Sequence, residues 1–230
     1  MQFIYVNKLL SRYQSCYIKG HSMQTALISV LDDAKWAIEQ SIVTILVLFD
    51  FSKAFDCISY KVLLTRLQMM GITGTKLRSF FNYLQGWQQA VCITRARPSD
   101  YRPISSGVPQ RSVLGPILYG LFITYLPRVL MYCKCRKYTD DTQIYLYALS
   151  SKLDDTLGLV ERDAQAIADW AINNGTVLDT KKTQVIILGS AQYTSSIDLA
   201  ILRKVRVNNT PLAYTTEVKN LGVTMNQTIK

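Results

Sequence analysis

Apolar residues recur along the chain with two different periods, one helical and one typical of strands. Between residues 24 and 39 they fall at helical spacing, and residues 41–49 (SIVTILVLF) then form a continuous apolar run of strand length. Two further helical patterns cover residues 60–70 and 76–85, with two glycines between them. The pattern therefore predicts an amphipathic helix, a buried strand and a helical hairpin.

The second half of the chain continues this mixture of helices and strands. Residues 87–94 alternate weakly enough to form a strand, residues 102–111 have the composition of a loop, and the apolar run at residues 112–126 predicts a buried helix. Another amphipathic helix covers residues 153–172. The remaining short strands are expected at residues 183–189, 204–209 and 218–223.

The composition is typical of a folded chain with a buried core. Of the 230 residues, 49% are hydrophobic and 18% are charged. The five cysteines are scattered without a CxxC pair, and the single histidine, His21, has no nearby partners, so we expect no structural zinc site. The apolar runs are too short or too interrupted to span a membrane and the N-terminus has no secretory pattern, so we expect a chain that is neither membrane-bound nor secreted.

The net charge adds an expectation about partners. The chain carries 26 basic and 16 acidic residues, a formal charge of +10 at pH 7, and the basic excess is larger in residues 1–115 than in the rest. Such a charge favours a polyanionic partner through long-range attraction. By itself it does not identify that partner.

Acidic residues follow two of the predicted strands. Asp50 comes directly after the first strand, and Asp140 and Asp141 lie at or beside the turn of a hairpin predicted from residues 135–138 and 142–149. If these strands are neighbours in one sheet, three carboxylates converge, and such a cluster suits two Mg²⁺ ions that leave sites for substrate phosphates. The alternative is that each acid is a solvated residue at a strand end.

Six segments, spread over nearly the whole chain, form an ordered set of motifs. They are GHSMQTAL, LVLFDFSKAFD, GVPQRSVLGPILY, KYTDDTQIY, WAINNGTVLDTKKTQVIILG and VKNLGVTM. Taken together they resemble the consecutive reverse-transcriptase motifs of LINE-type, non-LTR retrotransposon polymerases. A YxDD tetrapeptide alone would be a weak signal, whereas six motifs in order and at the right spacing are a strong one.

The resemblance implies an α/β (α+β) fold with a polymerase palm-type sheet and helices on one face. It places the fingers remnant and palm in residues 1–190, and the palm end and beginning of the thumb in residues 191–230. The first finger motifs, the full thumb and an endonuclease domain are not expected, so the chain resembles a truncated or decayed copy. A location in the nucleus or cytoplasm is the family expectation, and the oligomeric state is not implied.

The implied activity is that of an RNA-directed DNA polymerase, a reverse transcriptase. Such an enzyme adds dNTPs to the 3′-hydroxyl of a DNA primer on an RNA template by two-metal phosphoryl transfer, with two Mg²⁺ ions for which Mn²⁺ can substitute. The alternative is a catalytically inactive retrotransposon remnant that at most binds nucleic acid. Incorporation of nucleotides by a folded chain would separate the two.

The resemblance assigns catalytic roles to four residues. Asp50 and Asp140 match the family's metal-binding aspartates, and Asp141 is the second acid of the YxDD hairpin. Lys182, in LDTKKT, resembles the lysine suggested to protonate the leaving pyrophosphate as a general acid. The plainer interpretation of Lys182 is a solvated lysine, and the neighbouring Lys181 leaves the assignment between the two open.

Contacts to the incoming nucleotide are implied for four residues. Phe51 and Phe55 follow the first acid, and Phe55 matches the aromatic residue that stacks under the sugar and excludes a 2′-hydroxyl. Gln110 and Ser112, in GVPQRS, match the loop that contacts template and nucleotide. Phe55 could equally be one more phenylalanine of the core.

Contacts to the template and primer are implied for five residues. Gly107 and Pro109 would shape the GVPQRS turn. Tyr138 would pack beside the primer end, although a cross-strand packing role is the alternative. Leu221 and Gly222 belong to VKNLGV, which resembles the strand pair that supports the primer but on its own is an ordinary strand with a turn.

Basic residues also lie beside the predicted hairpin. Lys134, Arg136 and Lys137 could face nucleic acid, although a solvated strand edge is the commoner environment for such charges. Both interpretations place the three side chains at the surface.

Five positions depart from the family's pattern. Arg111 stands where the family usually has a glycine that allows close approach of template and nucleotide, and Cys16 also replaces a glycine. Ile18 replaces an arginine expected to help bind the triphosphate. Thr124 and Tyr125 stand where the family has an Asn-Asp pair. We expect weak or no polymerisation from this chain by itself.

Overall fold

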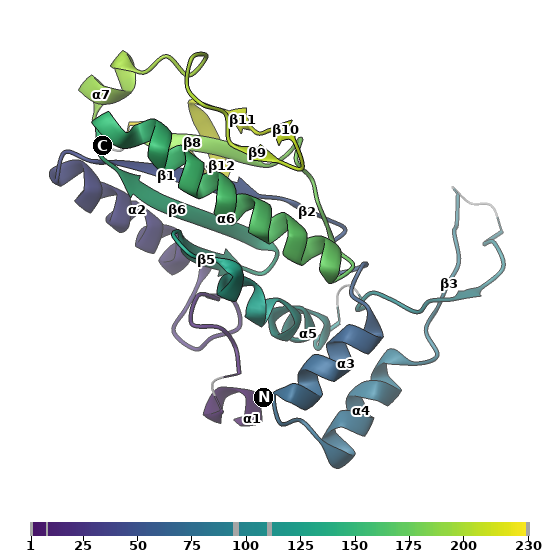
Figure 1. Ribbon diagram of the computed structural model, residues 1–230. Helices are drawn as coiled ribbons and strands as arrows, with labels where there is room; N and C mark the ends of the chain where they lie inside the picture. The colour runs from purple at the N-terminus through teal and green to yellow at the C-terminus, as the bar shows by residue number, and fades with distance from the viewer. Residues whose placement is uncertain (1, 8, 94–96, 110–111, 229–230) are drawn as a thin grey trace.

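The computed structural model describes residues 2–7, 9–93, 97–109 and 112–228 (Figure 1). The helices are α1 (Gln2–Val6), α2 (Met23–Glu39), α3 (Tyr60–Met69), α4 (Gly74–Leu84), α5 (Gly115–Phe122), α6 (Leu153–Asn173) and α7 (Ala191–Ser196), with 3₁₀ helices η1 (Ile123–Val129) and η2 (Ser150–Lys152). The strands are β1 (Val43–Phe49), β2 (Phe51–Ser52), β3 (Gln88–Gln89), β4 (Arg102–Pro103), β5 (Lys134–Tyr138), β6 (Asp141–Ala148), β7 (Val177–Leu178), β8 (Gln184–Leu188), β9 (Arg206–Val207), β10 (Thr210–Pro211), β11 (Ala213–Tyr214), β12 (Glu217–Asn220) and β13 (Val223–Asn226).

A five-stranded sheet in the order β11-β8-β1-β6-β5 forms the centre of the structure. The apolar strand β1 lies in its middle and pairs antiparallel with both β6 and β8, while β5 pairs antiparallel with β6. The register sets Phe49 opposite Thr142. The C-terminal end of β1 and the first residues of β6 therefore meet at the same end of the sheet.

Alternation along the strands divides the sheet into two apolar faces. On β1, Ile45 and Val47 pack into the core that includes α5 and α6, whereas Leu46 packs into a second core with α2 and the β12–β13 hairpin. Figure 1 shows α6 crossing the first face. The mixed α/β fold with a palm-type sheet is confirmed. The expectation that helices cover one face of the sheet is not met, because α5 and α6 pack on one face and α2 packs on the opposite face.

The expected helices at residues 60–70, 76–85 and 153–172 are confirmed as α3, α4 and α6. The buried helix predicted at residues 112–126 is shorter, since α5 ends at Phe122 and the chain continues as η1. Within the described part of the chain, no helix is long and apolar enough to cross a membrane.

The strand predicted at residues 87–94 is largely wrong. Only Gln88 and Gln89 pair, with β4, and both side chains are exposed. In Figure 1 this segment extends away from the sheet. Within the described residues 87–93, β3 pairs only with the two-residue strand β4 and is not part of the five-stranded sheet, and strand propensity without an apolar face to pack against does not suffice.

The segment after α7 packs onto the same sheet as the residues before it. Strand β11 pairs parallel with β8, Val205 and Val207 enter the core beside α6, and Val218 enters the core beside α2. The described residues after 190 therefore share both cores with the rest of the chain. A boundary at residue 190 stays a prediction.

Residues 13–15 extend the sheet beyond β5. The N–H of Lys137 donates to the carbonyl of Tyr13 at 2.8 Å, and the N–H of Ser15 donates to the carbonyl of Lys137 at 2.9 Å. The Lys137 side chain is fully buried, and its Nζ donates to the carbonyl of Ile123 at 2.7 Å. Burial lowers the pKa of Lys137 to about 8. The expectation that Lys137 lies at the surface is wrong, because its strand position points it into the core.

Candidate active site

The three acids converge at the end of β1 and β6. Asp50 directly follows β1, and Asp141 opens β6, whose next residue pairs with Phe49. Asp140 lies with Thr139 in the two-residue turn between β5 and β6, where Thr139 has φ 52°. The Thr139 hydroxyl donates to the Asp140 carboxylate at 2.8 Å, which fixes that side chain in the turn.

The electrostatics of this end of the sheet show that the acids influence one another. Partial burial raises the pKa of Asp141, and the charges of Asp140 and Asp50 raise it further. Burial also raises the pKa of Tyr119, with smaller contributions from Asp140 and Asp141, so this α5 residue lies behind the hairpin. The site concentrates the negative charge of three carboxylates at one end of the sheet.

Carboxylate oxygens are hard ligands, and in chemical type the three acids fit Mg²⁺. Within the described residues, however, no three His, Cys, Asp or Glu side chains are arranged so that they could hold one metal ion together. The three acids are still of the chemical type that binds magnesium, and a divalent cation would relieve the repulsion among them. The structure by itself does not show a metal centre.

The loop that carries Lys182 is attached to the backbone of Asp50. The N–H of Asp179 donates to the Asp50 carbonyl at 2.8 Å, and the N–H of Asp50 donates to the Thr183 hydroxyl at 3.5 Å. The Lys182 ammonium lies 3.6 Å from the Asp179 carboxylate and is largely exposed. These contacts keep the lysine beside the first acid while leaving its ammonium group accessible.

A small cavity of about 110 Å³ lies at this end of the sheet and is lined by Asp50, Asp141, Lys182, Lys219 and Leu221. It therefore brings together two of the expected acids, the expected lysine and the expected primer-supporting turn. Lys219 was not expected there. The nearest signal in the sequence is its position beside Leu221 in VKNLGV.

A buried hydrogen bond joins the β12–β13 hairpin to β6. Asn220 Nδ2 donates to Gln143 Oε1 at 2.8 Å, and both residues are buried. Gln143 lies two residues after Asp141 on β6. The hairpin turn itself has both central residues at positive φ, Leu221 at 48° and Gly222 at 80°. The polar pair therefore fixes this turn relative to the acids, which pattern analysis missed.

The two phenylalanines after Asp50 differ in exposure. Phe51 is buried in the core next to β7, so its side chain does not line the cavity with the acids. Phe55 is partly buried, and its ring packs against the ring of Tyr119 with the centroids 4.6 Å apart. Tyr119 thus connects Phe55 to the β5–β6 hairpin. A nucleotide contact for either phenylalanine stays a prediction.

The GVPQRS loop packs against the turn that follows Asp50. Gly107 donates to the carbonyl of Ile58 at 2.8 Å, has φ +89°, and a Cβ there would lie 2.8 Å from the backbone oxygen of Asp56. Only glycine fits this position. The Ser112 hydroxyl donates to the Pro109 carbonyl at 2.6 Å and accepts from Gly115 at 2.9 Å, so it caps the start of α5. Gln110 and Arg111 lie outside the described residues.

Tyr138, the last residue of β5, contacts the N-terminal segment. It pairs with Asp141 across the β5–β6 turn, and its hydroxyl lies beside the thiol of the buried Cys16. Burial raises the pKa of both groups. The cysteine at the first departure from the family's pattern therefore packs against Tyr138, and the primer contact of Tyr138 stays a prediction.

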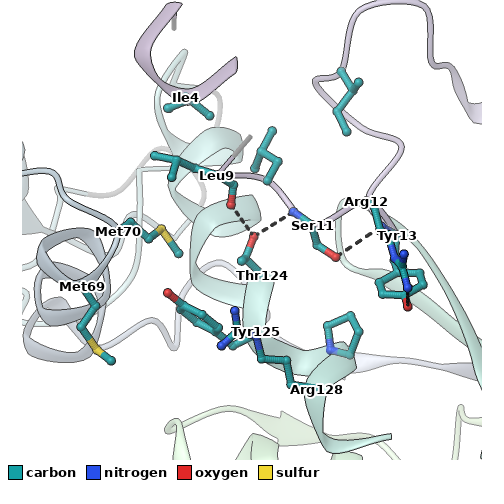
Figure 2. Close-up of a pocket in the computed structure, with 13 residues that line it drawn as sticks. Ile4, Leu9, Ser11, Arg12, Tyr13, Met69, Met70, Thr124, Tyr125 and Arg128 are labelled. Atoms are coloured by element: carbon teal, nitrogen blue, oxygen red, sulfur yellow. Dashed lines mark hydrogen bonds between the residues drawn. The ribbon is translucent and has the colours of Figure 1, made fainter. Parts of the chain in front are cut away.

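Three other residues that depart from the family's pattern line a large cavity away from the acids. This cavity of about 940 Å³ is formed between the N-terminal segment, the end of α3 and η1, and Ile18, Thr124 and Tyr125 line it. Figure 2 shows Thr124 bonded to the carbonyl of Leu9 at 3.3 Å and to the N–H of Ser11 at 3.2 Å. Thr124 therefore attaches the N-terminal segment to η1, and Ile18 faces an apolar space rather than the carboxylates.

Comparison with curated proteins finds mobile-element polymerases. The chain is 27% identical over 186 residues to a putative 115 kDa protein in the type-1 retrotransposable element R1DM of Drosophila melanogaster, covering 79% of this chain and 17% of that protein. It is 25% identical to the RNA-directed DNA polymerase from mobile element jockey of D. melanogaster, covering 96% of this chain and 24% of that protein. The chain thus spans a quarter or less of these relatives.

Among solved structures, the fold is similar to that of telomerases. Apo telomerase from Candida tropicalis, truncated from its C-terminal domain, superposes with a TM-score of 0.61 at 13% identity, covering 94% of this chain and 39% of that one. Telomerase from Candida albicans, in complex with a fragment of telomeric RNA, gives 0.57 at 13% identity, over 94% and 34%. The family profile described as reverse transcriptase (RNA-dependent DNA polymerase) matches residues 1–225. The chain belongs to the reverse transcriptase family.

Proposed function

We propose that this chain is the catalytic palm of an RNA-directed DNA polymerase that extends a DNA primer on an RNA template. One observation carries the proposal: the β1–β6 register brings Asp50 beside Asp141, with Asp140 in the adjoining turn. Carboxylates gathered at one end of a sheet supply the ligand type that two-metal phosphoryl-transfer sites use. Nucleus or cytoplasm remains the family expectation for where such a chain acts.

Asp50, Asp140 and Asp141 would hold two Mg²⁺ ions. When bound, these ions lower the pKa of the primer hydroxyl and neutralise charge on the triphosphate. Burial raises the pKa of Asp141 and the neighbouring charges of Asp140 and Asp50 raise it further, which supports this assignment because a divalent cation would offset both effects. The carboxylates orient the site and provide the negative charge that makes it selective for divalent cations.

The reaction forms one P–O bond and breaks another. The primer 3′-hydroxyl gives its proton to water, its oxygen bonds to the α-phosphorus of the dNTP, the bond between the α-phosphorus and the bridging oxygen breaks, and pyrophosphate leaves. Lys182, exposed at the mouth of the acid cavity, would give a proton to that pyrophosphate. Phe55 would lie under the incoming sugar, and Tyr138 and the turn at Leu221 and Gly222 would support the primer.

Primer extension tests the proposal. Purified chain is incubated with poly(rA)/oligo(dT), labelled dTTP and Mg²⁺ or Mn²⁺, beside D140A/D141A and a matched D155A control, which removes an exposed acid from the first turn of α6. Incorporation by wild-type and D155A that is lost in D140A/D141A is the expected result. Equal incorporation by all three proteins would reject the assignment of the acids.

A second candidate is a palm that binds nucleic acid without polymerising. The observation that favours it is the position of Ile18, which lines an apolar cavity where the family has an arginine. Salt-sensitive binding of the template–primer by a folded chain, without incorporation, would identify this function. Restored incorporation in I18R would attribute the loss to that substitution.

A further inference from the structure

A second cavity, distinct from the one at the acids, lies between the N-terminal segment, α2 and β5. It encloses about 480 Å³ and is lined by Arg12, Tyr13, Ser15, His21, Ser29 and Arg136, together with Gly20 and Thr25. No carboxylate lines this space, in contrast to the cavity at Asp50 and Asp141. We call it the Arg12–Arg136 cleft.

Both arginines are held in place by neighbours and keep donors for a ligand. Arg136 Nε donates to the Ser29 hydroxyl at 3.1 Å and Nη1 donates to the carbonyl of Cys135 at 3.1 Å. Arg12 Nη2 donates to the Tyr13 hydroxyl at 2.7 Å, and its guanidinium lies 4.9 Å from the centre of that ring. A guanidinium has five N–H donors, so each arginine has several left.

The acid closest to the cleft is already engaged elsewhere. Asp33 lies 4.0 Å from Arg136 Nη2, but Lys134 is nearer at 3.5 Å and the Tyr145 hydroxyl also donates to Asp33. Arg136 is therefore only partly neutralised. The cleft retains a positive charge that its protein surroundings do not compensate.

Ser15 contributes a hydroxyl to the cleft. The residue is 7% exposed and lines the cavity. A serine hydroxyl can donate one hydrogen bond to a ligand oxygen. Two arginines and a hydroxyl that converge on one space form a set of donors suited to a tetrahedral oxyanion.

The cleft lies on the same side of the sheet as the catalytic acids. Arg136 is two residues before Tyr138 on β5, so both side chains point to the α2 face, and Ser29 belongs to α2. From Arg136 to Tyr138, the last residue of β5, the strand rises by about 7 Å, at about 3.3 Å per residue, and Asp140 follows in the adjoining turn. The cleft therefore lies within a few nucleotides of the acids along a nucleic acid strand, at about 3.4 Å per nucleotide.

We propose that the Arg12–Arg136 cleft binds a backbone phosphate of the template–primer, a few nucleotides from the primer terminus. The inference rests on the proposed function, because it requires nucleic acid at the palm. Bidentate donation from the guanidinium groups, with the Ser15 hydroxyl, recognises the phosphate oxygens independently of base sequence. The same chemistry would accept the phosphates of a free nucleotide, and the experiment separates the two sources.

The salt dependence of template–primer binding is the first test. R12Q, R136Q and the double variant are compared with R206Q, which removes an exposed arginine on β9 and so changes the net charge equally. Each cleft variant is expected to weaken binding about five- to tenfold near 0.1 M salt and to reduce the slope of log K against log salt by about 0.7 to 0.9. R206Q should keep the wild-type slope.

A single uncharged linkage identifies the phosphate. A methylphosphonate is placed at successive positions of the template or the primer, and weakened wild-type binding is expected at one position within a few nucleotides of the terminus, with no further loss in R12Q/R136Q. If dTTP competes for wild-type and R12Q/R136Q equally, the free nucleotide is not the ligand. If dTTP competition alone is lost in the variants, the backbone assignment is wrong.

Failure of this inference is distinguishable from failure of the proposed function. Wild-type chain that binds the template–primer while R12Q, R136Q and R206Q share one salt slope would overturn the cleft and leave the polymerase proposal standing. Wild-type chain that binds no nucleic acid would reject both. R12Q guards against misfolding, because Arg12 is exposed and its replacement should not alter the urea midpoint.

Discussion

Charged side chains lie in two different environments around the β5–β6 hairpin, and the protein accommodates them differently. Asp50, Asp140 and Asp141 repel one another at an open end of the sheet, and the pKa of Asp141 is raised. Lys137, in the middle of β5, is sealed in the core with a carbonyl partner, and its pKa is lowered to about 8. The acids need a cation from outside, whereas the lysine is satisfied within the fold. Ligand sites are therefore marked by charges that the protein leaves uncompensated.

The largest effect is expected where the internal anchor is removed. Lys137→Ala leaves a cavity and an unpaired Ile123 carbonyl, so the free energy of unfolding should fall by about 3 kcal/mol in urea titrations at neutral pH. Lys137→Met keeps most of the volume and should lose less. Equal losses in both variants would show that the ammonium contact, not packing, determines the cost.

The same lysine gives a pH test of the comparison. Its folded pKa of about 8 lies below the ordinary 10.5, so the unfolded chain binds more protons between those values and stability should rise with pH across that window. Relative to Lys137→Met, the gain should approach roughly 3 kcal/mol by pH 10.5. A constant difference between the two proteins from pH 7 to 10.5 would mean that Lys137 is not sealed as described.

The next effect concerns the backbone contact behind Asp50. Gly107→Ala introduces a Cβ at 2.8 Å from the Asp56 oxygen at φ +89°, so it should cost more than about 2 kcal/mol. Gly71→Ala is the matched control, because Gly71 has φ +81° but open space around it, and should cost about 1 kcal/mol. Equal costs in thermal or urea unfolding would remove the steric part of the argument.

A smaller effect is expected for the hydrogen bond between the β12–β13 hairpin and β6. Asn220→Ala, Gln143→Ala and the double variant should show a coupling of about 1 kcal/mol in unfolding, because the pair is buried. In primer extension each single variant should raise KM for the primer more than it lowers kcat. Asn226→Ala, an exposed asparagine on the same hairpin, should leave both KM and kcat unchanged.

The smallest effect has the opposite sign. Because the folded pKa of Asp141 is raised, the folded chain binds more protons above pH 3.8 than the unfolded chain, and stability falls as pH rises through that window. Asp141→Asn should therefore stabilise the chain in EDTA at pH 7, by less than about 1 kcal/mol. Mg²⁺ should raise the melting temperature of wild-type protein and not of Asp141→Asn. A destabilised Asp141→Asn in EDTA would contradict the crowding of the acids.

Features that depend on the local pattern of apolar residues could be predicted from the sequence, whereas contacts between distant residues could not. The apolar run of β1 and the alternation in β6 predicted two strands with acids at their ends, and the resemblance to reverse transcriptases implied that Asp50 and Asp141 lie together. The burial of Lys137 depends on a carbonyl in η1, and the Asn220–Gln143 bond joins residues 77 positions apart. Neither contact leaves a periodic signal. Polar residues inside an apolar strand were the available clue, and their partners required the three-dimensional structure.

The segment at residues 13–15 has a consequence for self-association. It covers the outer side of β5 with two backbone hydrogen bonds, both at Lys137. An uncovered strand at the end of a sheet is a template for pairing with another chain. Detachment of this short segment would break those two bonds, the contacts of Thr124 and the packing of Tyr13 and Cys16, and would expose such a template. The N-terminal segment thus acts as a guard against aggregation as well as a wall of the Arg12–Arg136 cleft.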